Sequence, residues 1–175
     1  MAESFTSILL EGKVNSLGRT QEVVEIVLHD KSRLAELYQC LFEDDQWLRM
    51  RAGDALEKVC RVHPGWFTGY LSKLFNEMAK IDQPSIQWHL AQMLGEIELD
   101  ASYQQKANNL LCKNVSTTDV DWIVAANSMI TLVQFAKSRK IDAKTVMNLL
   151  KVQQHHHSNA VCKKATKLLA ELQNR

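Results

Sequence analysis

The feature that most constrains the fold is a pattern of apolar and small residues that occurs four times along the chain. Each copy starts with a branched or aromatic residue and continues with small or apolar residues four, five, seven, eight and eleven positions later. These offsets follow one side of a helix with 3.6 residues per turn. The copies start at Leu48, Ile86, Trp122 and Val161, which are 38, 36 and 39 positions apart. Near-constant spacing of four amphipathic helices predicts a helical repeat protein.

Each of these helices follows another amphipathic stretch, so the chain is expected to form four helical pairs. The preceding stretches are residues 33–42, 66–79, 101–113 and 143–152. Asp30, Asp100 and Asp142 can cap three of them. A further helix over residues 20–28 would cover the N-terminal end. Because one pair cannot bury its apolar face alone, the pairs are expected to stack into one core.

The composition agrees with a single all-α domain over residues 1–175. Six glycines and two prolines leave little room for the tight turns of a multi-stranded sheet. The repeats are expected over residues 17–175. Residues 1–15 form an N-terminal segment, which either packs on the cap through Ile8, Leu9 and Leu10 or stays loose.

The charge balance argues against a general nucleic-acid binder. The chain has 21 basic and 20 acidic residues and a net charge of +1, whereas proteins that neutralise phosphates usually carry an excess of Lys and Arg. Its start lacks the features of a secretory signal, and its most apolar run, residues 123–133, is too short to span a bilayer. A cytoplasmic location is expected, with no membrane partner.

One segment carries a resemblance to a known family. The pattern Leu48-Arg49-x-x-Ala52-Gly53-x-Ala55-Leu56, after Asp44-Asp45, resembles the second helix of a HEAT repeat. The segments that start at Ile86 and Val161 are similar. The resemblance covers roughly residues 17–175 and implies a right-handed α-solenoid of about four HEAT-like hairpins plus an N-terminal capping helix. In this family the second helices usually line a concave face.

The resemblance places polar side chains between the core positions on that face. The best candidate binding site combines a cation, a carboxylate, an indole, an imidazole and an amide, which are supplied by Arg51, Asp54, Trp88, His89 and Gln92. In the structural alternative, Arg51 pairs with Asp54 within one helix and Trp88 shields the seam between repeats. The residues alone favour this alternative, and both interpretations are carried forward.

Two further groups of residues have simpler interpretations. Lys163, Lys164 and Lys167 form a secondary basic patch, either a solvated helix face or a contact for an acidic surface. The run of residues 155–157 is three histidines, which point in different directions when adjacent on a helix and so predict a polar loop rather than a metal site. Trp122 is predicted to pack in the core. No metal and no cofactor are expected.

The sequence contains none of the motifs of the common enzyme classes: no P-loop, no dinucleotide-binding glycine motif, no nucleophile elbow and no H-E-x-x-H. The expected function is therefore a non-catalytic scaffold or accessory module that binds another protein through the concave face. The alternative is a DNA-binding protein or a glycosylase for DNA-alkylation repair, because some such glycosylases resemble HEAT solenoids. For that activity Trp88, Asp54 and Arg51 would supply the Trp, Asp and Arg of the concave face.

Overall fold

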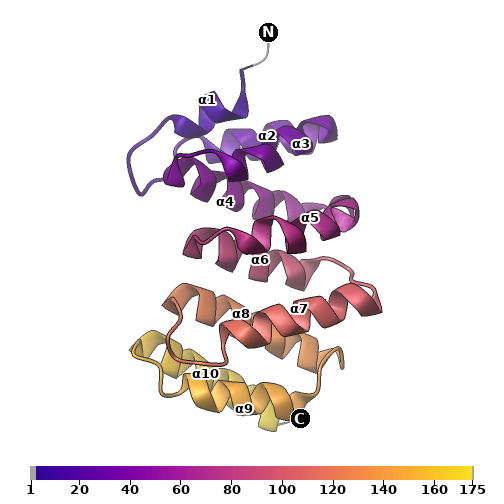
Figure 1. Cartoon of the computed structure of the whole chain (residues 1–175), viewed down its shortest axis with the longest axis vertical. Helices are drawn as coiled ribbons and strands as arrows, with labels where there is room; N and C mark the ends of the chain where they lie inside the picture. The colour runs from indigo at the N-terminus through magenta and orange to yellow at the C-terminus, as the bar shows by residue number, and fades with distance from the viewer. Residues whose placement is uncertain (1–2, 175) are drawn as a thin grey trace. The chain divides into compact units, whose positions relative to one another are not determined.

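The computed structural model describes residues 3–174, and this part of the chain is all-α (Figure 1). It contains α-helices and short 3-10 helices and no strand, which confirms that the fold is all-α as predicted. The described residues divide after Met93 into two compact units. The dividing point lies within helix α6, and each unit is described here by itself.

The first unit is built around α4. Its elements are α1 (Phe5–Leu10), α2 (Thr20–His29), η1 (Lys31–Arg33), α3 (Leu34–Gln39), η2 (Cys40–Phe42), α4 (Gln46–Val62), η3 (Pro64–Tyr70), α5 (Leu71–Asn76), η4 (Met78–Lys80) and most of α6 (Pro84–Glu96). Helices α1, α2 and α3 all contact α4. The two stretches predicted as single helices over residues 33–42 and 66–79 are instead short α-helices flanked by 3-10 turns.

The start of α4 shows why the sequence folds locally as predicted. The side chain of Asp45 accepts hydrogen bonds from the backbone N–H groups of Trp47 and Leu48, both at 2.8 Å, and so satisfies two of the free donors at the helix start. Every apolar position of the first pattern copy is buried, from Leu48 to Val59. The N-terminal segment is packed as well, because Phe5 and Ile8 of α1 are buried.

The second unit contains four long helices. They are α7 (Ala101–Asn114), α8 (Trp122–Lys137), α9 (Ala143–Gln153) and α10 (Asn159–Gln173). Helix α8 contacts the other three, and α9 packs against α10. Asp100, Asp121 and Asp142 each accept hydrogen bonds from the first backbone N–H groups of α7, α8 and α9. No helix in residues 3–174 has the length and apolar content needed to cross a membrane.

The predicted register of the third pattern copy is wrong. Trp122, its predicted first core position, is 51% exposed, and Ile130 is 41% exposed. If the copy starts at Val124 instead, all six of its positions are buried, namely Val124, Ser128, Met129, Thr131, Leu132 and Phe135. The starting residues 48, 86, 124 and 161 are then 38, 38 and 37 positions apart, which is more regular than the sequence alone suggested.

The end of α8 has a conformation that usually requires glycine. The N–H of Lys140 donates to the carbonyl of Phe135 at 2.8 Å and the N–H of Arg139 to that of Ala136 at 3.1 Å, the two bonds of a Schellman motif. This motif places Arg139 at φ 59°, in the left-handed region where a side chain is strained. The chain therefore carries an arginine at a position where glycine would be more stable.

We expect Arg139→Gly to raise the free energy of unfolding by about 1 kcal/mol, because glycine adopts this φ without the clash of a Cβ. Arg139→Ala is the matched control, since it removes the same charge but keeps the strained backbone. Urea unfolding of the three proteins measures the difference. Equal stabilities of the glycine and alanine variants would contradict the assignment of strain to this position.

Candidate functional site

Arg51, the predicted cation of the binding site, is buried beneath the N-terminal segment. Its side chain is 2% exposed, and its three guanidinium nitrogens donate to backbone carbonyl oxygens. Nε bonds Ser16 at 2.8 Å, Nη1 bonds Leu9 at 2.6 Å and Nη2 bonds Lys13 at 2.8 Å. This guanidinium thus ties α4 to the end of α1 and the loop after it, and offers no free donor pair to a partner.

Two glycines allow the loop to close around Arg51. Gly12 has φ 120° and Gly18 has φ 51°, both in the region that disfavours side chains. A Cβ on Gly12 would lie 2.8 Å from the Cα of Gly18, and a Cβ on Gly18 would collide with the carbonyl of Glu11. The loop can therefore bring three carbonyls to one guanidinium only with glycine at both positions.

Asp54 does not pair with Arg51, so the predicted ion pair within the helix is wrong. Its carboxylate lies 2.7 Å from Nζ of Lys58, one turn further along α4. Such i,i+4 pairs on a partly exposed helix face stabilise by only a few tenths of a kcal/mol. Asp54 is half-buried and remains near the surface of the first unit.

His89 is the buried member of the candidate site. It is 6% exposed and packs on Gly53 of α4, where an added Cβ would lie 3.3 Å from His89 Cδ2. Burial lowers the pKa of His89 from 6.5 to about 4, although the nearby Asp54 carboxylate and the Gln92 amide act in the opposite direction. The imidazole is therefore neutral at neutral pH, and its Nδ1 is buried without a hydrogen bond of good geometry.

Trp88 and Gln92 complete the cluster on α6. Both are half-buried, and the indole ring centroid lies 5.1 Å from that of His89. The structure thus brings Trp88, His89, Gln92 and Asp54 together, while Arg51 points to the N-terminal segment instead. The imidazole of His89 is buried and the carboxylate of Asp54 is paired with Lys58. The cluster therefore resembles a packing contact between α4 and α6, with the indole of Trp88 partly exposed at its edge.

A second candidate surface lies between α8 and α10 and was missed in the sequence. A pocket of about 300 Å³ opens there, with an apolar floor and a polar rim. Its lining consists of Ile130, Val133, Gln134, Lys137, Ser138, Leu168 and Glu171. The incorrect register of the third pattern copy concealed it, because it assigned Ile130 to the core.

The predicted basic patch borders this pocket. Lys163 and Lys167 are exposed and Lys164 is half-buried on α10. Lys137 donates to Glu171 at 2.7 Å and, together with the charges of Lys167 and Lys164, holds the pKa of Glu171 below its usual range. Two of the three patch lysines, Lys164 and Lys167, therefore lie close enough to the pocket rim to act on its carboxylate.

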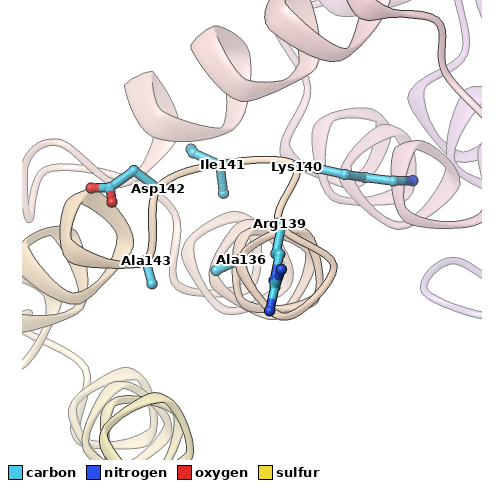
Figure 2. A pocket seen from close by; sticks show the side chains of 6 residues that line it. All are labelled: Ala136, Arg139, Lys140, Ile141, Asp142 and Ala143. Atoms are coloured by element: carbon cyan, nitrogen blue, oxygen red, sulfur yellow. The ribbon is translucent and has the colours of Figure 1, made fainter. Parts of the chain in front are cut away.

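The turn between α8 and α9 has a pocket of about 390 Å³ (Figure 2). It is lined by Ala136, Arg139, Lys140, Ile141, Asp142 and Ala143. Figure 2 shows that the charged side chains of Arg139, Lys140 and Asp142 point in three different directions. They do not converge on one position in space, so this pocket lacks the focused polar groups of a ligand site.

The three histidines lie in the turn between α9 and α10, as predicted. His156 is buried, where its Nδ1 accepts from the N–H of Ser158 at 2.9 Å and its Nε2 lies 3.0 Å from the carbonyl of Val120. Since a carbonyl only accepts, Nε2 carries the proton. Within residues 3–174, no three His, Cys, Asp or Glu side chains are grouped to hold a metal ion.

A comparison of the chain with protein-family models, with curated proteins and with solved structures finds no match.

We expect Arg51→Met to lower the free energy of unfolding by about 3 kcal/mol, because three carbonyls lose their charged donor at once. Hydrogen exchange should accelerate selectively in residues 9–18, which those bonds order. The control is Arg139→Ala, which removes an exposed arginine from the turn after α8. Unchanged exchange in residues 9–18 of the Arg51 variant would show that the guanidinium does not hold the loop.

We expect His89 to make the protein less stable in mild acid. A pKa lowered by folding gives stability that is fully present above about 6.5 and is lost as the pH falls towards about 4. Between pH 7 and pH 5 this loss is about 2 kcal/mol. Urea unfolding of wild type and His89→Asn at both pH values isolates the contribution, and equal losses in the two proteins would contradict it.

Proposed function

We propose that the chain is a non-catalytic protein-binding module of the HEAT type. It binds its partner through the outward face of its second helices, which is the side that carries the solvent-exposed residues. The single observation that carries this proposal is the solvent exposure of two large apolar side chains, Trp122 and Ile130, on α8. Aromatic and branched side chains are costly to leave in water, and in interfaces they supply much of the binding energy. Their exposure on one helix is typical of a surface that a partner covers.

The regular burial pattern supports the HEAT-type arrangement. The pattern copies that start at residues 48, 86 and 124 bury all six of their positions, and the copy that starts at residue 161 buries five. Repeats with the same buried offsets are suited to stacking in one direction, which is how helical repeat proteins acquire an extended binding surface. The positions outside the buried pattern are mixed in all three helices: Met50 and Val62 of α4, Trp88 of α6, and Trp122 and Ile130 of α8 are apolar side chains that are not buried.

The first-unit cluster supports a structural rather than a catalytic role. His89 is covered and Arg51 bonds three carbonyls, so neither offers a reactive or binding group to a substrate. Asp54 is already paired with Lys58. Trp88 and Gln92 are half-buried on α6.

The DNA-directed alternative receives less support. It requires Arg51 to contact DNA together with Asp54 and Trp88, yet the guanidinium of Arg51 lies under the N-terminal segment. The net charge of +1 gives little general attraction to phosphates. We expect no binding to duplex DNA at low salt, and Arg51-dependent binding would favour this alternative.

The test of the proposed function is capture of partners from an extract of the source cells on the immobilised 175-residue chain. We expect at least one protein held by the wild type to fall about tenfold when Trp122 and Ile130 are both changed to alanine, because the apolar contact is lost. Quantitative mass spectrometry measures the retention. Circular dichroism checks that the variant stays folded.

The matched control is Val152→Ala, which removes another exposed apolar side chain from α9, a first helix of its pair. It should retain the same partners as the wild type. If every captured protein is held equally by the wild type, the double variant and the control, the outward face of α8 does not bind a partner.

A further inference from the structure

The pocket between α8 and α10 has an apolar floor and enough open space for a side chain. Val133 and Leu168 are almost completely buried and form its base, while Ile130 is 41% exposed at its edge. Its volume of about 300 Å³ is at the lower end of ligand pockets and suits a side chain better than a large cofactor. An apolar side chain inserted here would cover Ile130.

Positive charges outnumber negative charges around this pocket. Lys164, Lys167 and Glu171 occupy positions i, i+3 and i+7 of α10, which lie on one helix face. Lys137 of α8 adds a third cation and pairs with Glu171 at 2.7 Å. Lys164 and Lys167 form no ion pair with any residue in the described part of the chain. Three cations thus surround one carboxylate at the rim.

We infer that this pocket binds a peptide segment of a partner protein in which a bulky apolar residue is flanked by Asp or Glu. The apolar residue would contact Ile130, Val133 and Leu168, and the flanking carboxylates would contact Lys164 and Lys167. Complementary charge at a rim favours encounter and the choice of partner, while the apolar anchor supplies most of the affinity. The inference rests on the proposed function and specifies its partner.

The apolar floor distinguishes this partner from a nucleic acid. A phosphodiester backbone would use the lysines alone and would gain nothing from an exposed isoleucine. The lysines in turn distinguish it from a purely apolar partner, because burying them without an acidic group would cost solvation energy. An acidic segment with an apolar anchor uses both features together.

The experiment is selection of a phage-displayed library of random peptides on the folded 175-residue chain. We expect enriched peptides to carry a Leu, Ile, Phe or Trp with Asp or Glu within four residues. Synthetic copies, measured by fluorescence anisotropy, should bind about tenfold more weakly to Ile130→Glu and to the double variant Lys164→Glu, Lys167→Glu. Their affinity for the wild type should fall as salt rises.

The control is Val152→Glu, which places the same new charge at an exposed apolar position of α9. It should bind the peptides as the wild type does. Thermal unfolding of all variants is measured first, to check that each variant is folded. We expect unchanged stability, because none of the side chains of Ile130, Lys164 and Lys167 is buried.

Three results would overturn the inference. They are enrichment of peptides without acidic residues, equal binding of the enriched peptides to the Ile130 and lysine variants, and tighter binding of an oligonucleotide that depends on the lysines but not on Ile130. If one of these occurs while partner capture still falls when Trp122 and Ile130 are both changed to alanine, the proposed function stands and only the assignment of the partner fails. If partner capture is also unaffected by every variant, both fail.

Discussion

Burial of one stripe of small and branched side chains on each second helix is the constraint on which the structure depends. In α4 the stripe fixes which side faces the interior, and Gly53 lets Ile86 and His89 of α6 approach closely. The same stripe determines which side chains of the helix face the solvent. Because helix faces are set by periodicity, correct placement of the buried residues also identifies the residues available to a partner.

The α8 helix shows how far the sequence alone can identify that stripe. Trp122 and Ile130 seemed suited to the core by their chemistry, whereas the true core positions include the polar Ser128 and Thr131. Ser128 is tolerated inside because its hydroxyl accepts a hydrogen bond from Asn114 of α7 at 3.1 Å. Such a partner is distant in the chain, so hydrophobicity alone assigned the wrong face. The α-helical class and the second helices were predictable, since strong local patterns determine them.

The candidate site was less predictable for a similar reason. The register argument correctly placed His89, Gln92 and Trp88 together on α6, close to Asp54. It did not reveal that Arg51 turns to backbone carbonyls, because those carbonyls belong to a loop whose shape depends on Gly12 and Gly18. Backbone acceptors carry no residue-specific signal in a sequence. Interactions that depend on a folded loop therefore become visible only in the structure.

The central claim is that α8 presents Trp122 and Ile130 outward and buries Met129. Hydroxyl-radical footprinting with mass spectrometry tests this most directly, because Trp and Met side chains both react rapidly when water reaches them. The account predicts fast labelling of Trp122 and strong protection of Met129, which is fully buried. Protection of Trp122 together with fast labelling of Met129 in the free protein would contradict the account.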